Sequence, residues 1–443
     1  MELYSIPYQD GYIVYRPLLQ LAFVANAAMV NLLARLDGPP FAPASDAERQ
    51  ALSFLEEIGF FEPDPEPPPA PSAESPYQPT VAVLCLTTAC NFRCVYCYAR
   101  GGETEVRHLP VELGRRAIDL VSRNALDRGE DRFSLAFHGG GEPTLAGRQL
   151  RALVRDARSR EVACQVSLTT NGYWTANQRA WLLDNIDQVS LSLDGLPEVQ
   201  DRQRPTTGGR PSFARVLASA QAMDRRKVSY GIRLTVTDDS IGGLRAGLDL
   251  LCRETRCGVF QVEPAFAYGR ALDRHGALSR IQRFGEAFLE AWEIGAVHDR
   301  HVYYSGARPW LATRRFCQAL DQALVVTPDG ALTACYEVCG PEHPLAGGFF
   351  FGTMGQVDLT ARQRIHERIE QRRARCSGCF CFWHCAGDCP SKTLAPDGGE
   401  RPDAKERCEL NRFITKELLI RYMDAGGGLW RGYEAPRKEV AAC

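Results

Sequence analysis

Short apolar runs alternate with helix-like patterns over the middle of the chain. Six runs have the length and composition of buried strands: 81–86, 133–137, 164–168, 189–193, 231–236 and 259–262. Helical patterns separate them at 111–126, 148–159, 176–183, 213–224 and 244–253, and a further one begins at Ser279. This alternation is typical of parallel strands joined by right-handed helical crossovers. We therefore predict an α/β domain of six repeats over residues 80–299.

The first 62 residues carry a different pattern. Apolar residues predict strands at 12–16 and 21–24 and helices at 27–36 and 46–58, the second capped by Ser45. This order resembles a small winged-helix domain. Eight prolines then fall between positions 63 and 79, which predicts an extended linker without helix. Residues 300–443 follow the alternating region and form the last predicted domain.

Composition limits the class of protein. A chain of 443 residues exceeds what one core usually serves, which agrees with several domains. Lys and Arg (52) balance Asp and Glu (54), so no basic field attracts nucleic acid. The apolar stretch 18–36 is interrupted by polar residues, and we expect no membrane partner. Seventeen cysteines without an export signal predict metal sites in the cytoplasm rather than disulfides.

Three cysteines follow the first predicted strand of the α/β region. Cys90, Cys94 and Cys97 have the spacing C-x3-C-x2-C on the loop that leaves this strand. Iron–sulfur clusters usually take four thiolates, so three in one tight loop favour a [4Fe–4S] cluster with one open iron. A zinc site, or cysteines that only fill the core, is the alternative interpretation of this spacing.

The cysteine spacing, with Tyr96 between the last two cysteines and Tyr98 after them, resembles the signature of radical S-adenosylmethionine (SAM) enzymes. The resemblance implies that SAM chelates the open iron through its amino and carboxylate groups. An electron from an external reductant such as flavodoxin or ferredoxin then cleaves SAM to methionine and a 5′-deoxyadenosyl radical, which abstracts hydrogen from a substrate. It also implies that the six repeats form a partial (β/α)6 barrel.

Polar motifs follow the later strands, where the ends of parallel strands place functional groups. They are Gly-Gly-Gly-Glu-Pro at 139–143, Thr-Thr-Asn-Gly at 169–172 and Ser-Leu-Asp-Gly at 192–195. By resemblance, the expected SAM contacts are Tyr96, Gly140, Gly141, Glu142, Pro143, Thr169, Asn171, Ser192, Asp194 and Arg233. Arg233 and Glu263 have a second interpretation, an ion pair inside the barrel.

A second set of cysteines lies beyond residue 300. Its order resembles the SPASM extension of radical SAM enzymes, which holds two auxiliary [4Fe–4S] clusters. The resemblance implies one cluster on Cys376, Cys379, Cys385 and Cys408 and the other on Cys317, Cys335 and Cys389. A zinc ribbon is the alternative for 376–389. No cysteine lies between Cys257 and Cys317 to complete the second cluster, which leaves an open iron, Cys339 or Cys381 as its fourth position.

The resemblance implies a maturase that crosslinks a ribosomal precursor peptide through C–C or thioether bonds. The N-terminal unit either captures the leader of that peptide by strand addition or only packs on the core. One rival is a sulfatase-type maturase, which forms formylglycine; its relatives carry an acid directly after the cysteine at position 335, whereas this chain has Tyr336 and then Glu337. Glu337 is either a displaced catalytic base or a solvated turn residue. A small-molecule enzyme and a non-enzymatic electron carrier are the other rivals.

The arginine-rich stretch 362–375 is interpreted as a charged helix face, with a docking patch for an acidic peptide as the alternative.

Overall fold

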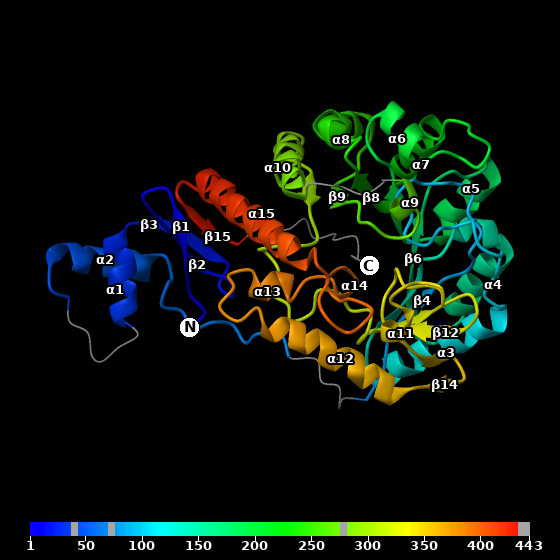
Figure 1. Cartoon of the computed structure of the whole chain (residues 1–443), viewed down its shortest axis with the longest axis horizontal. Coiled ribbons are helices and arrows are strands. Elements are labelled where there is room, and N and C mark those ends of the chain that lie inside the picture. The colour runs from blue at the N-terminus through cyan, green and yellow to red at the C-terminus, as the bar shows by residue number, and fades with distance from the viewer. Residues whose placement is uncertain (37–42, 70–75, 275–280, 433–443) are drawn as a thin grey trace.

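Eight parallel strands make up most of the larger sheet in a computed structural model, which describes residues 1–36, 43–69, 76–274 and 281–432 (Figure 1). All six predicted strands are present, and a further parallel strand joins each side. In spatial order they are β10 (His301–Tyr303), β9 (Val259–Pro264), β8 (Ser229–Val236), β7 (Gln188–Ser192), β6 (Ala163–Thr170), β5 (Arg132–Phe137), β4 (Val81–Leu84) and β11 (Ala323–Val326). The antiparallel strands β12 (Ala331–Thr333), β13 (Phe350–Thr353) and β14 (Gln356–Val357) extend the sheet beyond β11.

Helices connect successive strands, as the alternating pattern predicts. They are α3 (Val111–Asp127), α4 (Gly147–Arg158), α5 (Ala176–Asn185), α6 (Pro197–Gln203), α7 (Phe213–Arg226), α8 (Leu244–Glu254), α9 (Arg270–Arg274) and α10 (Ile281–Val297), with short 3-10 turns η1 (Pro143–Ala146) and η2 (Ile241–Gly243). Ser279, the predicted start of α10, lies outside the described residues. In α3, the buried residues Ala117, Val121 and Ala125 recur every fourth position and fix the face that meets the sheet.

The N-terminal unit is a small sheet with two helices, α1 (Ala27–Leu36) and α2 (Asp46–Glu57). Its strands are β1 (Tyr4–Tyr8), β2 (Gly11–Arg16) and β3 (Leu21–Ala25), of which sequence patterns predict the last two. The Ser45 hydroxyl accepts a hydrogen bond from the backbone N–H of Glu48, as the cap signal predicts. The fourth strand, β15 (Leu429–Arg431), comes from the other end of the chain and pairs with β3.

The N-terminal sheet shares its core with the rest of the molecule. Ile6, Ile13 and Tyr15 belong to the same buried apolar cluster as the parallel strands. The described linker residues, 63–69 and 76–79, form neither helix nor strand. The first unit is therefore joined to the barrel by packing and by β15 as well as through the linker.

The C-terminal segment adds short helices around one long one. They are α11 (Ala346–Phe349), α12 (Leu359–Ala374), α13 (Phe382–Cys385), α14 (Pro390–Thr393) and α15 (Ala404–Ala425). Helix α15 packs on α10, where Gly285 faces Phe413, and leads into β15 (Figure 1). In the described part of the chain, no helix is long and apolar enough to span a bilayer.

The arginine-rich stretch lies mostly on a helix, as its interpretation as a charged helix face predicts, but two of its arginines are buried. Arg362 is 4 % exposed and lies over the ring of Tyr77, and Arg373 is 7 % exposed. Arg368 donates to the backbone oxygen of Ala395. Through these contacts α12 packs against the rest of the C-terminal segment. Arginines can be buried in this way when they are paired.

Candidate functional site

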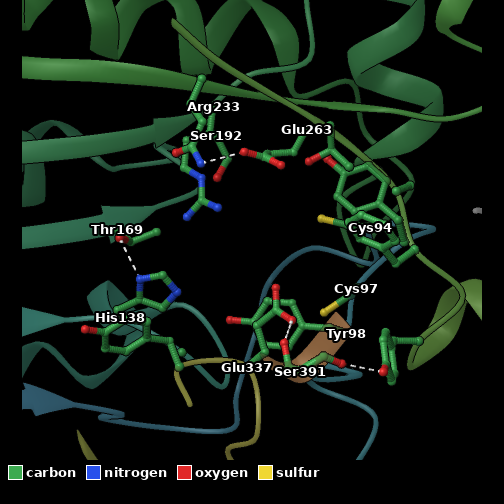
Figure 2. Close-up of a pocket in the computed structure, with 18 of the residues that line it drawn as sticks. Cys94, Cys97, Tyr98, His138, Thr169, Ser192, Arg233, Glu263, Glu337 and Ser391 are labelled. Atoms are coloured by element: carbon green, nitrogen blue, oxygen red, sulfur yellow. Dashed lines mark hydrogen bonds between the residues drawn. The ribbon is translucent and has the colours of Figure 1, made fainter. Parts of the chain in front are cut away.

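The polar loops after the parallel strands surround a cavity of about 310 Å³ (Figure 2). On the barrel side its lining includes Cys90, Cys94, Tyr96, Cys97, Gly140, Gly141, Glu142, Thr169, Asn171, Ser192 and Arg233. On the C-terminal side it includes Cys317, Cys335, Glu337, Cys389 and Lys392. Of the predicted SAM contacts, Pro143 and Asp194 are not part of the lining.

Two arginines hold the first cysteine loop in place. Arg270, on α9, donates to the backbone oxygens of Cys94 (2.6 Å) and Gly101 (3.2 Å) and pairs with Glu103 (2.6 Å). Arg93 donates to the backbone oxygen of Cys90 (3.0 Å). Sequence reasoning missed both arginines, because their partners are backbone oxygens that leave no trace in the sequence. The loop is therefore rigidly supported before any cofactor binds.

Burial raises the pKa of two thiols of this loop, those of Cys90 and Cys94. Burial, followed by the neighbouring cysteines, raises the pKa of Cys90 to about 12. Burial also raises the pKa of Cys94 to about 11. Backbone N–H groups of Phe92 (3.5 Å) and Gly101 (3.4 Å) point at the sulfurs of Cys90 and Cys97. Such sites take up positive metal centres, which remove the protons from the thiols.

The glycine-rich loop after β5 is hydrogen-bonded to the cysteine loop. The N–H of Gly141 donates to the backbone oxygen of Thr87 (2.7 Å), and that of Glu142 donates to Ala89 (2.8 Å). A Cβ on Gly141 would lie 1.9 Å from the oxygen of Ala89, so only glycine fits there. Gly139 and Gly140 adopt positive φ angles of 94° and 70°. The glycines are needed to bring the two loops together.

Glu142 already has several donors around its carboxylate. Oε1 accepts from the hydroxyls of Thr144 and Thr170, each at 2.7 Å, and Oε2 accepts from the N–H of Asn171 (2.8 Å). Despite these bonds, burial raises the pKa of Glu142. The side chain thus ties the glycine-rich loop to the end of β6, in addition to facing the cavity.

Tyr96 and Asp194 form part of a buried network. The Tyr96 hydroxyl donates to Asp194 Oδ2 and accepts from Arg204 (2.7 Å). Asp194 also accepts from Gln203 (2.9 Å) and from the N–H of Thr235 (3.1 Å). The network fixes the cysteine loop to the ends of β7 and β8. Arg204 and Gln203 were not identified from the sequence.

Asn171 ties the cysteine loop to β6. Its side-chain amide donates to Asn91 (2.7 Å). Three of the expected cofactor contacts, Tyr96, Asn171 and Asp194, therefore position the loop that carries the cysteines.

Arg233 and His138 present polar groups to the centre of the cavity. Figure 2 shows the guanidinium of Arg233 pointing into this space from β8. The nearby carboxylate of Glu263 accepts from Gln261 (2.9 Å) and the N–H of Ser305 (3.0 Å). His138 bonds the Thr169 hydroxyl through Nδ1 (3.2 Å), and burial lowers its pKa to about 3, so the ring is neutral. His138 directly precedes the glycine motif and was not singled out from the sequence.

Glu337 lines the cavity, so its interpretation as a solvated turn residue is wrong. Lys392 donates to Glu337 Oε2 at 2.5 Å, and Ser391 lies 3.3 Å from the same oxygen. Burial opposes ionisation of Glu337, but Lys392 and Arg233 outweigh it and lower its pKa. The Lys392 ammonium also lies over the rings of Phe266 (4.8 Å) and Tyr268 (4.6 Å). Glu337 is a half-buried carboxylate beside the cavity and remains a candidate base.

The remaining cysteines fall into two regions. Cys317, Cys335 and Cys389 border the cavity, whereas Cys376, Cys379, Cys385 and Cys408 are absent from its lining. Arg372 donates to the sulfur of Cys408 (2.9 Å), and Asn411 donates to that of Cys385 (3.3 Å). Among the described residues, no three His, Cys, Asp or Glu side chains are grouped as ligands of one metal ion.

Cys339 and Cys381, the two candidates for the fourth ligand of the second cluster, are not part of the cavity lining. The Cys381 thiol hydrogen-bonds Cys379 and lowers the pKa of that residue to about 6, against the effect of burial. Cys339 donates to the backbone oxygen of Tyr336 (2.8 Å), and a Cβ on Gly139 would touch both Cys339 and Cys85. Cys381 is thus placed with the cysteines outside the cavity.

Residues 84–241 match the model of the radical SAM superfamily. The chain carries a radical SAM domain. Radical SAM enzymes use a [4Fe–4S] cluster and SAM, and the site fits both: three thiols share one supported loop, and the glycine-rich loop offers backbone groups beside them. The match and the site together indicate an enzyme with a radical SAM domain.

This chain is similar to sulfatase-maturating enzymes and to GTP 3′,8-cyclases. It is 26% identical over 343 residues to the serine-type anaerobic sulfatase-maturating enzyme of Klebsiella aerogenes, covering 73% of this chain and 82% of the relative. Its fold resembles that of anSMEcpe with bound SAM (TM-score 0.60, 18% identity, 78% of this chain, 99% of the other). It also resembles Streptococcus suis SuiB with bound SAM (TM-score 0.54, 14% identity, 91% and 98%). SuiB has likewise been solved with its precursor peptide SuiA.

Proposed function

We propose that the protein is a peptide maturase, which removes hydrogen from a ribosomal precursor peptide and forms a C–C or thioether crosslink. The observation that carries the proposal is the composition of the cavity. It is bounded on one side by the radical SAM cysteines and on the other by a second cysteine group with Glu337 and Lys392. A peptide residue held between these walls meets both groups at once.

The residues around the cavity have separate roles in this proposal. When bound, the cluster and SAM supply a carbon radical that takes a hydrogen atom from the substrate. Cys90, Cys94 and Cys97 would hold the cluster, and the loops around Gly141 would hold SAM. Arg233 presents its guanidinium to the SAM carboxylate. Glu337 accepts a proton from the substrate residue, with Lys392 holding its carboxylate in place.

The second cysteine group holds auxiliary clusters in this proposal. Cys317, Cys335 and Cys389 would hold one beside the cavity, and Cys376, Cys379, Cys385 and Cys408 another nearer the surface. When bound, such clusters would supply an acceptor for the electron that the substrate loses with its hydrogen atom and proton. Flavodoxin or ferredoxin supplies the electron that starts the reaction.

The extent of the fold favours a precursor peptide over other substrates. The likeness to SuiB spans 91% of this chain, against 78% for anSMEcpe. The N-terminal unit contains an antiparallel sheet, and many domains capture extended peptides by adding a strand to such a sheet. We propose that this sheet binds the leader segment of the precursor.

The test is co-expression of the enzyme with each short reading frame beside its gene, followed by mass measurement of the peptide. Loss of two hydrogens that tandem fragmentation places between two residues is expected for a crosslink. Anaerobic incubation of the purified enzyme with SAM and a strong reductant should release 5′-deoxyadenosine and methionine. Turnover of a metabolite with no modified neighbouring peptide would contradict the proposed substrate class.

A second candidate function is supported by the Klebsiella aerogenes relative, which aligns over 82% of its own length. In this alternative the enzyme oxidises one serine or cysteine of a sulfatase to formylglycine. A synthetic sulfatase peptide separates the two functions. An aldehyde on that peptide supports the sulfatase activity, and an unchanged peptide together with a crosslinked precursor supports the first proposal.

A further inference from the structure

The N-terminal sheet has one edge that resists a new strand. At this edge, Pro7 of β1 has no N–H, and its backbone oxygen accepts from Lys416 of α15 (2.6 Å). Alternate residues of an antiparallel strand point their backbone groups to the same side. Within β1 only Ser5 therefore offers an N–H outward. A peptide needs a row of donors and acceptors to pair, so this edge is blocked.

At the opposite side, β15 occupies the edge of β3. The register pairs Leu429 with Phe23, Trp430 with Ala22 and Arg431 with Leu21. The N–H of Gly432 adds a bond to the oxygen of Gln20 (2.7 Å). Without β15, the backbone groups of β3 along this side would be unpaired. Because β1 is blocked, β3 is the edge at which a peptide can join the three strands.

The connection before β15 is made of glycine. Three consecutive glycines, 426–428, link the end of α15 to β15. Gly427 and Gly428 have positive φ angles of 67° and 100°, and a Cβ on either would meet no atom within 4 Å. These two glycines are thus used for conformation, whereas a Cβ on Gly426 would lie 2.1 Å from the backbone oxygen of Leu429. A strand of three residues on such a connection can leave the sheet without unfolding α15.

The packing of β15 also leaves buried polar atoms without hydrogen-bond partners in the described part of the chain. Trp430 is 4 % exposed and stacks on Tyr422 (5.6 Å) beside Tyr15 (6.2 Å). The indole Nε1 of Trp430 and the hydroxyl of Tyr15 are both buried, and neither has a hydrogen-bond partner among the described residues. Buried polar groups normally find partners, so β15 leaves this site partly unsatisfied. A different strand that offers an acceptor to Tyr15 would fit better.

We propose that β15 is an internal competitor, which covers the peptide-binding edge of β3 until the leader of the precursor peptide displaces it. The inference rests on the proposed function, because it takes the displacing partner to be the precursor. The leader segment that fits is extended and places an aromatic side chain between Tyr15 and Tyr422. It also brings a hydrogen-bond acceptor to the Tyr15 hydroxyl. The edge is thus closed in the free enzyme and open to a peptide that pairs better than β15 does.

Two truncations test the proposal. One ends the chain after Gly428 and removes β15, and its matched control ends after Gly432 and keeps it. The probe is a synthetic peptide with the sequence of residues 426–432, added to each protein while hydrogen exchange is followed at residues 21–25. We expect faster exchange in the shorter protein and restored protection on addition of the peptide. The control protein should show neither effect.

Binding of the precursor gives the second measurement. Both the shorter truncation and Trp430→Ala should bind the co-expressed precursor at least tenfold more tightly than the control truncation. Trp181→Ala, a substitution on α5 far from the sheet, should leave the affinity unchanged. Equal exchange and equal affinity in the two truncations would overturn the proposal. Loss of the folded N-terminal sheet in both the shorter truncation and Trp430→Ala would also overturn the proposal. In that case β15 would be needed for the sheet to fold.

Failure of the proposed function gives a different result. All variants should release 5′-deoxyadenosine from SAM with the same rate in the absence of peptide. If no precursor is modified by any variant, the peptide-maturase proposal fails. The exchange experiment with the synthetic peptide still decides whether β15 leaves the edge of β3.

Discussion

The charged side chains around the cavity fall into two kinds. Arg204, Lys392 and Arg407 each have a carboxylate partner, namely Asp194, Glu337 and Asp388. Arg233 instead points into the cavity (Figure 2). The paired residues maintain the walls, and Arg233 is placed to meet a bound anion. This difference predicts that substitutions of the two kinds affect different measurements.

Loss of a buried partner should reduce stability. Asp194→Asn leaves Arg204 without a counter-charge, and the side chains of this pair are 0 % and 8 % exposed. We expect the free energy of unfolding to fall by about 3–5 kcal/mol in anaerobic denaturant titrations. In the exposed pair of Arg226 with Asp184, Asp184→Asn should cost less than about 1 kcal/mol. Similar losses in both variants would contradict the role of the network.

Arg233→Gln should weaken the binding of SAM without unfolding the protein. Loss of a charge-assisted hydrogen bond is worth about 1.5–3 kcal/mol, which corresponds to a rise in Kd of roughly 10- to 150-fold. Anaerobic calorimetry with SAM measures this change. Arg253→Gln on the exposed face of α8 is the control. An unchanged Kd for Arg233→Gln would exclude this residue from the SAM site.

His301 gives the stability a pH dependence. Burial lowers its pKa to about 4, below the value of about 6.5 in an unfolded chain. The folded protein therefore binds fewer protons, so its stability is full above pH 6.5 and falls as the pH drops toward 4. His301→Phe, which keeps a ring beside Tyr303 and Trp310, should lose less stability over this window, by up to about 3 kcal/mol. Parallel curves of Tm against pH for both proteins would disagree with this.

At the scale of elements, the glycine-rich loop and the cysteine loop form one unit. Gly141→Ala places a methyl group 1.9 Å from the backbone oxygen of Ala89, so the loops must separate. We expect the purified variant to hold less iron and to show weaker cluster absorption than the native enzyme. Gly208→Ala, where an added Cβ meets nothing within 4 Å, should retain full iron content. Equal iron in both variants would show that the loops tolerate separation.

Strands with a strong apolar pattern were predictable from the sequence. Short strands, and side chains whose partners lie in distant segments, were not. The strands at 81–86 and 259–262 were found because buried parallel strands are continuous apolar runs. β1 and β15 were missed: in β1 only Ile6 is fully buried, and β15 is three residues long. The burial of Arg362 on α12 was not predicted because its partner, Tyr77, comes from a distant segment.

In the candidate site, too, some residues could be predicted from the sequence and others could not. Motifs with unusual spacing, such as the three cysteines and the glycine run, identified the cavity walls from the sequence. Residues that act through backbone oxygens, such as Arg270, could not be found in this way. Which motif residue faces a ligand and which supports a loop also depends on geometry, as Asp194 and Arg233 demonstrate.

At the scale of the whole molecule, the N-terminal unit is not separable by simple deletion. Removal of residues 1–62 would expose Trp430, which packs against Tyr15 and stacks on Tyr422. It would also remove the partner of β15. We expect this protein to aggregate or to unfold at a markedly lower Tm, measured by scanning calorimetry under anaerobic conditions. A soluble, unchanged core would show that the two parts fold independently. Point substitutions in β3 are therefore better tests of peptide capture than truncation.

The pairing of β3 with β15 also has a consequence for biosynthesis. The first three strands of the N-terminal sheet are translated before the parallel strands, whereas their fourth strand is translated after them. A nascent chain therefore displays the bare side of β3 throughout elongation. During that interval any extended peptide nearby, including a precursor translated from the same message, meets an uncovered strand.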